Sequence, residues 1–348
     1  MSKLILMSAQ NQPVPSLLVV ILNYRTPNLT IDCLHSLEEE VRSLPNTKVA
    51  VVDNDSGDRS FEQINHTVDT QNWRDWVSVT ASGRNGGYAF GNNVAIRPAL
   101  ASDYPPDYVL LLNPDTKVRP GALRVLLDFM EQNPQVGIAG SRLEEPDGTP
   151  QCSAFRFPTF WSELDSSLRL GIVSQLLAKW IVAPEVSEVA CTTDWVAGAS
   201  MMVRRQVFLD VGLIDEEYFM YFEELDFCLQ AQKAGWSCWY VPESKVIHFV
   251  GQSSGVTNTK VAPKRRPKYW FESRQRFFLK NYGFAYTLFA DTLWMLGFMA
   301  WQVRRVMQNK PNIDPPFFLI DFFSNSLISS QFTKQISKSK IDNLQFNS

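Results

Sequence analysis

Three nearly uninterrupted apolar runs constrain the fold of this chain more than any other feature. Residues 16–23 (SLLVVILN), 48–52 (KVAVV) and 108–112 (YVLLL) are apolar at almost every position, without alternating polar side chains. Strands buried on both faces have this pattern, which is typical of parallel sheets. Residues 29–41 show the apolar spacing of a helix between the first two runs, which predicts a βαβ unit. We therefore expect an α/β fold whose central sheet is mostly parallel.

Polar side chains follow these runs at the points where the strands are expected to end. Asn23 closes the first strand, Asp53 and Asp55 follow the second, and Asn113 and Asp115 follow the strand at 108–112. In open α/β sheets, ligands bind outside the carboxyl ends of the strands. Carboxylates gathered there can hold a hard divalent cation. Asn-Pro-Asp is also a common turn string, so a purely local role stays open at this point.

A glycine-rich segment, residues 83–93 (GRNGGYAFGNN), follows a third expected strand at 76–80 and precedes a helical stretch at 94–100. Glycines let the backbone approach a ligand closely, and a helix start offers free N–H donors. The segment lacks the Gly-Lys-Ser/Thr ending of a phosphate-binding Walker loop and the spacing of a dinucleotide fingerprint. A ligand-binding loop and an ordinary glycine turn both fit these residues.

The acidic run Glu223-Glu224-Leu225-Asp226 lies among aromatic residues. Burial among apolar rings raises the pKa of a carboxyl group, and such a group is a candidate general base. The alternative is that the acids only complement the dipole at the start of a surface helix. His248, one of three histidines, ends an expected strand just before a flexible loop at 251–255. A neutral imidazole there could complete a metal site with Asp115.

Charge and cysteine content exclude several classes of protein. The formal net charge of −3 provides no basic field for nucleic acid. The number of cysteines, five, is odd, and no two of them have CxxC spacing. The sequence therefore indicates neither a disulfide framework nor a zinc knuckle. We expect a cytoplasmic, reducing setting. Residues 1–15 contain an apolar stretch too short for a secretory signal, and we interpret them as an N-terminal tail.

The segment 284–303 is about as long as a bilayer-spanning helix, which needs roughly 20 residues. Asp291 lies within it, and Thr287, Gln302 and Arg305 fall near Asp291 on a helical wheel. This pattern favours an amphipathic helix in peripheral contact with a membrane, supported by the basic residues of 260–268. A core helix, a homo-oligomer contact and a true span are the alternatives. The expected organisation is a tail (1–15), an α/β domain (16–283), a helical appendage (284–330) and a polar tail (331–348).

Eight motifs in one order extend across residues 16–282. They are VVILNYRTPNLTIDCLHSL from Val19, VVDNDSGD from Val51, RNGGYAFGNNVAI from Arg84, LLLNPDTKVRPGAL from Leu110, DGTPQCSAFRFP from Asp147, DWVAGASMMVRR from Asp194, GLIDEEYFMYFEELDFCLQAQKAGW from Gly212, and VIHFVGQSSG from Val246. This series resembles the family 2 inverting glycosyltransferases of the GT-A fold, in particular the rhamnosyltransferase-like branch. The resemblance implies a Rossmann-like nucleotide-diphospho-sugar transferase fold with a mostly parallel sheet and a C-terminal helical appendage.

The resemblance also assigns roles to positions of this chain. It implies a catalytic base at Glu224 with Asp226 as the second acid of the motif, and a metal ion, Mg²⁺ or Mn²⁺, on Asp115 and His248. It places the acceptor near Trp195, Gly198 and Glu223. The expected donor-binding residues are Asn23, Asp53, Asp55, Asn85, Gly87, Asn92, Asn113 and Asp115.

The implied reaction moves a sugar, rhamnose in this branch, from a dTDP- or UDP-linked donor to a hydroxyl of a surface glycan or lipid-linked glycan, at the inner face of the cytoplasmic membrane. The acid pair is Glu223-Glu224 where the family has Glu-Asp. Gln230 stands where an arginine is common, so Arg204 or Arg265 is expected to take over its role. A catalytically silent binding relative is one alternative. A sugar-phosphate nucleotidyltransferase is another, but it needs a basic glycine-rich loop after the first strand, which residues 23–27 do not provide.

Overall fold

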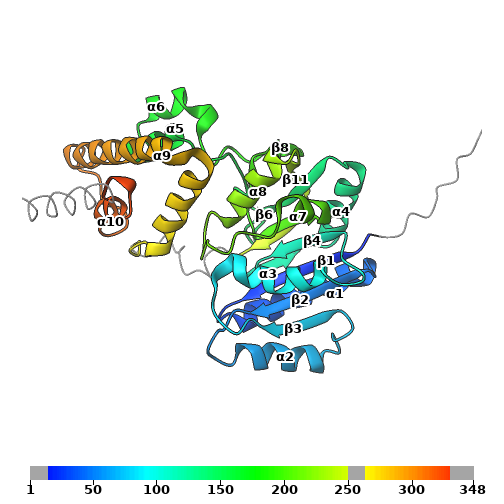
Figure 1. Ribbon diagram of the computed structural model, residues 1–348. Coiled ribbons are helices and arrows are strands. Elements are labelled where there is room, and N and C mark those ends of the chain that lie inside the picture. Colours follow the sequence, from blue (N-terminus) through cyan, green and yellow to red (C-terminus); the bar gives the residue numbers. More distant parts are fainter. Residues whose placement is uncertain (1–14, 250–262, 330–348) are drawn as a thin grey trace, which may run out of the picture.

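The computed structural model describes residues 15–249 and 263–329, and its centre is a mixed sheet. The strand order is β3-β2-β1-β4-β10-β6-β11-β5 (Figure 1). Strand β8 also pairs with β11, along residues 238–240. Strands β3, β2, β1 and β4 are parallel, and β10 is antiparallel to both β4 and β6. The strands are β1 (Leu17–Asn23), β2 (Thr47–Asp53), β3 (Val77–Ala81), β4 (Tyr108–Leu112), β5 (Thr116–Val118), β6 (Val136–Glu144), β8 (Cys191–Thr193), β10 (Ser200–Arg204) and β11 (Ser237–His248). The expected mostly parallel α/β sheet is confirmed.

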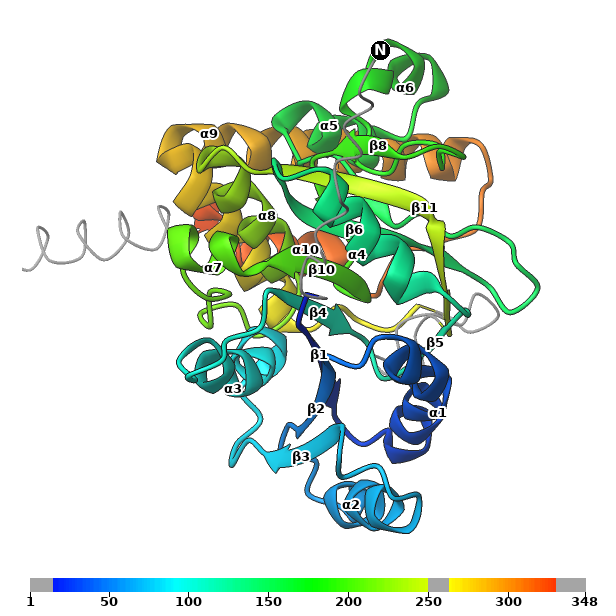
Figure 2. The same ribbon diagram turned by 90° about the vertical axis from the view of Figure 1, so that its right-hand side faces the viewer.

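Helices cover both faces of this sheet (Figure 2). The apolar sides of α1 (Pro27–Ser43), α2 (Ser60–Thr70) and α4 (Ala122–Gln132) form one buried cluster with the sheet. The other cluster includes α3 (Gly87–Leu100), α7 (Arg205–Val211) and α8 (Glu223–Lys233). The central strands β1, β4 and β10 have no solvated face, which is why their sequences are apolar at successive positions.

The sheet register brings the strand-end residues together. Asn23 pairs directly with Asp53 across β1 and β2, and Ile21 pairs with Leu112 at the end of β4. The carboxyl ends of these three strands therefore lie side by side, as the βαβ pattern predicted.

Several boundaries differ from the sequence prediction. Helix α3 begins at Gly87, seven residues before the expected start at 94, and so already includes Gly91, Asn92 and Asn93 of this segment. Strand β9 (Trp195–Val196) is separate from β10 and pairs with β7 (Ala154–Phe155) in a small second sheet. Strand β11 continues through Pro242, where a register shift against β6 accommodates the interruption.

The C-terminal part forms a helical unit beside the sheet domain (Figure 1). Helix α9 (Lys268–Met307) bends at Gly283, whose φ of 82° is not helical. Helix α5 (Phe160–Leu168) packs on α9, and so does α10 (Phe318–Ser324). Residues 160–180, which we call the insert, include α5 and also α6 (Gly171–Leu176) and the 3-10 helix η1 (Ala178–Trp180). Helix α9 thus extends across residues 283 and 284, and a domain boundary at this point stays a prediction.

The polar side of α9 points inward, and the expected peripheral contact of this helix with a membrane stays a prediction. Thr287 and Asp291 are completely buried. Arg274 donates to Asp291 at 2.7 Å and to Glu163 of α5 at 2.6 Å, forming a buried ionic triad. Within residues 15–249 and 263–329, no helix combines the length and the hydropathy needed to cross a bilayer. The expected tails, the loop at 251–255 and the first residues of the basic segment at 260–268 lie outside the described residues.

Candidate active site

The first component of the site is a polar cluster at the ends of β1 and β2. Asn23 donates to the Asp53 carboxylate at 2.6 Å, and Ser56 donates to the same carboxylate through its hydroxyl at 2.6 Å and its backbone N–H at 3.1 Å. The side-chain oxygen Oδ1 of Asn23 accepts a hydrogen bond from the Thr30 hydroxyl at 3.0 Å. Both Asn23 and Asp53 are almost completely buried. This network holds the turn at 53–57 in one geometry, in which exposed Asp55 has a left-handed φ of 56°.

The glycine-rich segment is fastened to this turn by Asn54. The side-chain N–H₂ group of Asn54 donates to the side-chain oxygen Oδ1 of Asn85 and to the backbone oxygen of Gly87, both at 3.1 Å. Asn85 in turn accepts from the Gly87 N–H at 3.1 Å, and Asn92 donates to the Tyr88 carbonyl one helical turn earlier. The ends of β2 and the start of α3 are thus one connected polar unit.

At Gly87 the glycine-rich segment touches the loop that precedes the acidic run, at Phe219. A Cβ at Gly87 would lie 1.9 Å from the Phe219 carbonyl oxygen, and its φ is +86°. The next residue, Tyr88, donates its backbone N–H to that same oxygen at 2.8 Å. Only glycine permits this contact, which brings residues 87 and 219 together from distant parts of the chain.

The acidic run begins helix α8 after two strained residues. Tyr221 and Phe222 have φ values of 70° and 69°, a region that bulky side chains rarely adopt. Tyr221 contacts Tyr269, and Phe222 contacts Trp270 and Phe277, all of α9. The first half of α9 therefore holds the turn that presents the acids.

Glu223 and Glu224 lie in the first turn of α8, and each has one carboxylate oxygen without a hydrogen-bond partner among the described residues. Burial raises the pKa of Glu223 well above its ordinary value, and the neighbouring charge of Glu224 raises it further. Burial also raises the pKa of Glu224. Glu223 is 3% exposed, whereas Glu224 keeps part of its surface accessible. Glu224 is thus the less buried residue of the pair.

Tyr88 lies between the components of the site. Its hydroxyl donates to the Gly198 carbonyl at 2.9 Å, in the turn between β9 and β10. Burial raises the pKa of Tyr88, and the charges of Glu224, Glu223 and Asp115 add to the effect. The acid pair and Asp115 are therefore close enough to Tyr88 to act on it electrostatically. Gly198, Asn92, Asp115 and the acid pair are the predicted site residues that lie close to this one side chain.

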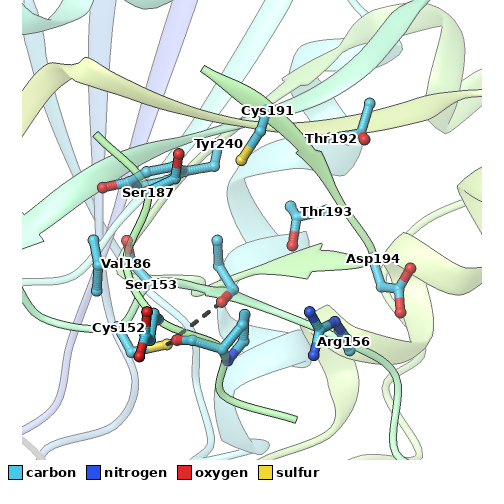
Figure 3. Close-up of a pocket in the computed structure, with 13 residues that line it drawn as sticks. Cys152, Ser153, Arg156, Val186, Ser187, Cys191, Thr192, Thr193, Asp194 and Tyr240 are labelled. Carbon is cyan, nitrogen blue, oxygen red and sulfur yellow. Dashed lines mark hydrogen bonds between the residues drawn. The ribbon is translucent and has the colours of Figure 1, made fainter. Parts of the chain in front are cut away.

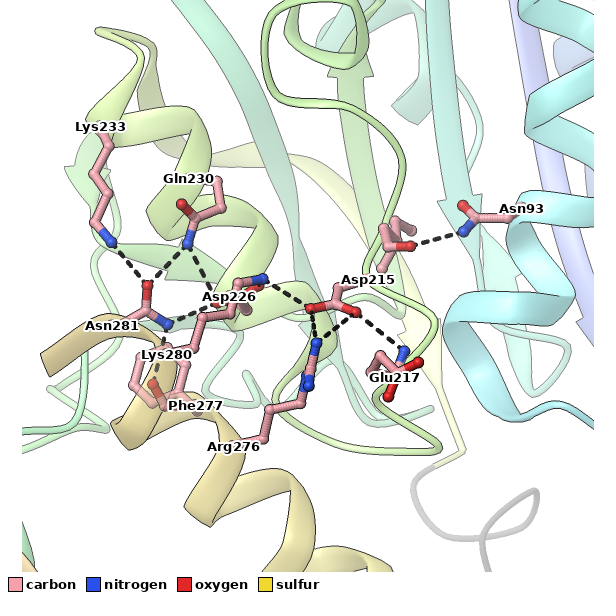
Figure 4. A network of polar contacts seen from close by, with 11 residues as sticks. Asn93, Asp215, Glu217, Asp226, Gln230, Lys233, Arg276, Phe277, Lys280 and Asn281 are labelled. Carbon is pink, nitrogen blue, oxygen red and sulfur yellow. Dashed lines mark hydrogen bonds and ion pairs between the residues drawn. The ribbon is translucent and has the colours of Figure 1, made fainter. Parts of the chain in front are cut away.

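Asp226 faces away from this arrangement and towards α9 (Figure 4). It is 2% exposed, and its carboxylate accepts from Lys280 at 2.6 Å, from Asn281 at 2.7 Å and from Gln230 at 3.3 Å. Lys280 also contacts Asp215 at 2.8 Å. These partners satisfy the Asp226 carboxylate, so its contacts favour a role in fastening α8 to α9 over one in proton transfer.

Asp115 and His248 come together as expected, since β5 and β11 pair next to them. Asp115 is buried, and its Oδ1 lies 3.5 Å from His248 Nε2. A carboxylate oxygen and an imidazole nitrogen are suitable ligands for Mn²⁺ or Mg²⁺. Residues 15–249 and 263–329 contain no group of three or more acidic, histidine or cysteine side chains able to hold a metal. The pair therefore fits a metal ion that takes its other ligands from phosphate oxygens and water.

The cations expected to replace the missing arginine are engaged elsewhere. Arg204 donates to the carbonyl oxygens of Val136 and Met130 and to the Tyr108 hydroxyl. Arg265 makes a paired contact with Asp321 of α10 at 2.6 and 2.8 Å. Both therefore have structural partners away from Asp115.

Trp195 is anchored on the small sheet, where it stacks on Phe155 at 4.2 Å and donates to the Arg156 carbonyl at 3.0 Å. A cavity of about 310 Å³ lies beside this sheet (Figure 3). Its lining includes Cys152, Cys191 and Tyr240. None of the predicted site residues lines this cavity, so it is separate from the cluster around Tyr88.

Sequence reasoning did not identify Asn54, Tyr88 or Lys280 as site residues. Asn54 and Tyr88 lie inside motifs that were recognised, and their positions next to Asp53 and Gly87 were the available signal. Lys280 carries no motif, and its contact with Asp226 spans 54 residues of sequence. Asn113 contributes through its backbone, with its N–H donating to the Ala199 carbonyl at 3.1 Å.

Comparison with known proteins identifies relatives for most of the chain. Residues 3–277 match the family model described as glycosyltransferase like family 2. The chain is 33% identical over 195 residues to an N-acetylglucosaminyl-diphospho-decaprenol L-rhamnosyltransferase of Mycobacterium tuberculosis, covering 51% of this chain and 61% of the relative. It is 33% identical over 172 residues to rhamnosyltransferase WbbL of Escherichia coli K12, covering 47% and 62%. It thus spans about three-fifths of the length of these relatives.

The fold is also similar to that of a solved glycosyltransferase. The crystal structure of GalNAc-T7 with UDP, GalNAc and Mn²⁺ superposes with a TM-score of 0.54 at 14% sequence identity, covering 92% of this chain and 58% of that one. At this identity the likeness establishes the GT-A fold alone.

Proposed function

The chain belongs to glycosyltransferase like family 2, and we propose that it transfers a sugar, rhamnose in the first instance, from a nucleotide-diphospho-sugar to a hydroxyl of a glycan or lipid-linked glycan. The rhamnosyltransferases of M. tuberculosis and E. coli support this choice of sugar. The observation that carries the proposal is the arrangement around Tyr88, whose backbone N–H joins the glycine-rich segment to the loop before the acid pair and whose hydroxyl contacts Gly198.

Glu224 is the proposed general base. Its raised pKa makes it a stronger proton acceptor than an ordinary glutamate, and its surface is partly accessible. As the acceptor oxygen attacks the anomeric carbon, its proton moves to Glu224, and the bond to the nucleoside diphosphate breaks. A single displacement inverts the configuration at that carbon. While Glu224 is ionised and ready to accept the proton, Glu223 stays protonated, because two adjacent buried carboxylates do not both ionise readily.

Asn23, Asp53 and Asn85 form the proposed wall for the donor nucleotide, since their network fixes the turn at the ends of β1 and β2. Asp115 and His248 are the residues that would hold Mg²⁺ or Mn²⁺. Oxygens of the donor diphosphate would supply further ligands. Bound there, the metal supplies positive charge that stabilises the departing diphosphate. Trp195 and Gly198 belong to the acceptor side in this assignment.

The proposal is tested with purified protein, a panel of dTDP- and UDP-sugars, Mn²⁺, and a polyprenyl-diphosphate-linked sugar acceptor. Mass spectrometry detects the added hexose or deoxyhexose, and nuclear magnetic resonance gives the anomeric configuration of the product. Transfer with inversion from dTDP-rhamnose is expected. Retention of configuration would contradict the single displacement. Donor binding without transfer or hydrolysis would instead support a silent binding relative.

A further inference from the structure

The exposed side of the second half of α9 is apolar over several turns. Phe289, Leu296, Met299, Val303 and Val306 are 43–68% exposed and recur at intervals of three, four and seven residues. This spacing places them on one side of a helix, which we call the outer face of α9. Of the twenty large apolar residues that are exposed in the described parts of the chain, fifteen belong to residues 161–176 or 284–323. Exposed apolar surface is therefore concentrated in the helical unit.

This distribution is the reverse of that in an ordinary surface helix. The one acidic residue of 284–303, Asp291, is buried against Arg274, while the apolar side chains point outward. Contiguous exposed apolar surface marks a site of interaction with a protein or a membrane. The outer face therefore needs a partner that accepts apolar side chains.

Charge indicates which partner this is. Residues 263–329 contain ten lysines and arginines against four acidic residues, a formal charge of +6. Residues 1–262 contain twenty basic and thirty-one acidic residues, a formal charge of −11. Arg265, Arg274, Arg276 and Lys280 are paired with carboxylates. Lys264 and Lys310 are exposed, so exposed positive charge and exposed apolar surface share one end of the sequence, as in segments that bind anionic lipid surfaces.

A second copy of the chain fits the outer face less well. Paired helices select their register with charged residues beside the apolar seam. Along 289–306 the charged residues are the buried Asp291 and the two arginines Arg304 and Arg305, so two copies of the outer face would bring no opposite charges together. A bilayer requires no register. We propose that the outer face of α9 docks on the surface of an anionic lipid bilayer, lying in the interface without crossing it.

The first half of α9 connects this surface to the candidate site. Ser273 donates to the Met220 carbonyl at 3.0 Å, and Tyr269 contacts Phe219 and Tyr221. Docking would therefore hold the bilayer near the loop that presents Glu224. The docking proposal does not depend on the reaction, but a lipid-linked acceptor would lie in the same membrane.

Vesicle sedimentation of the full chain tests the proposal. The vesicles are phosphatidylcholine alone or phosphatidylcholine with phosphatidylglycerol. The wild type is expected to bind the anionic vesicles, less so at high salt because screening weakens the charge attraction. The double variant Leu296→Asp/Val303→Asp should lower the partition coefficient by about tenfold or more, since it removes two apolar side chains from the interface.

Leu209→Asp is the matched control, because Leu209 is 62% exposed on α7 of the α/β domain. It should bind vesicles like the wild type, and all three proteins should melt at similar temperatures by circular dichroism. Absence of wild-type binding, or equal binding by the double variant, overturns the proposal. Light scattering adds a second criterion: a wild-type dimer that the double variant dissociates would assign the outer face to a second copy.

Discussion

The backbone N–H of Tyr88 donates to the carbonyl oxygen of Phe219 at 2.8 Å, across 131 positions of the chain. This one bond joins the glycine-rich segment at the start of α3 to the loop that presents the acid pair. Gly87 allows it, because any Cβ there would collide with the same oxygen. The donor side and the catalytic side of the proposed site are thus positioned against each other by backbone atoms.

Gly87→Ala should therefore reduce transfer activity as well as stability. Alanine at a left-handed φ costs roughly 1–2 kcal/mol, and the added Cβ also displaces Phe219. Gly83→Ala is the control, since Gly83 has a φ of +79° and no atom within 4 Å of an added Cβ. Chemical denaturation and steady-state kinetics should show the strain in both variants and the loss of kcat only in Gly87→Ala. Equal kinetic effects would contradict the positioning role.

Glu224→Gln should lower kcat by about 10²–10⁴-fold, the usual contribution of a general base. Donor binding, measured by calorimetry, should be retained because the nucleotide wall is formed by other residues. In the wild type, kcat should fall on the acid side at a pH above the ordinary glutamate pKa of 4.5, since burial raises the pKa of Glu224. Normal turnover by Glu224→Gln would exclude it as the base.

Glu223→Gln should stabilise the protein at neutral pH. Burial raises the pKa of Glu223 in the folded state above its ordinary value of 4.5. The folded state then binds the proton more tightly than the unfolded state, so stability decreases as pH rises from 4.5 through the folded pKa. Glutamine removes this loss. Melting temperatures should match the wild type below pH 4.5 and exceed it at pH 7, whereas exposed Glu39→Gln should show no such dependence.

Lys280→Met should lower the free energy of unfolding by about 1–3 kcal/mol, because it leaves the buried Asp226 carboxylate with fewer donors. Lys268→Met removes an exposed pair with Glu272 and should change stability by less than about 1 kcal/mol. Urea denaturation of both variants measures the difference. Equal small effects would show that the Asp226 contact does not fasten α8 to α9.

Asp115→Asn should weaken the metal dependence of donor binding. Replacing one carboxylate oxygen by an amide removes the anionic ligand next to His248. Calorimetric titration of the nucleotide with and without Mn²⁺ should show a large difference in the wild type and a small one in the variant. An equal response to Mn²⁺ in both proteins would place the metal elsewhere.

The positions and parallel direction of strands β1, β2 and β4 were predictable because burial on both faces leaves a direct trace in the sequence. The runs ending at Asn23, Asp53 and Leu112 are strands β1, β2 and β4, almost to the residue. The start of α3 was not predictable from periodicity, because its first residues are held by Asn85 and Phe219 and not by an apolar stripe.

The candidate site was predictable in its motifs but not in its long-range contacts. Which side of α9 is covered was not predictable: Asp291 faces inward because Arg274 and the backbone N–H of Leu327 are its buried partners. A helical wheel shows that polar residues share a side and does not show which side is covered. The role of Asp226 in holding α9 likewise depends on Lys280, which no local pattern connects to it.

The buried triad of Glu163, Arg274 and Asp291 has a consequence for the order of events during synthesis. Glu163 leaves the ribosome more than a hundred residues before its two partners, and α5 has no surface to pack on until α9 exists. The strands up to β4 can assemble early, whereas the insert at 160–180 must wait for the last fifth of the chain. A chain stopped before residue 291 should therefore expose its insert to proteases even though its sheet can form.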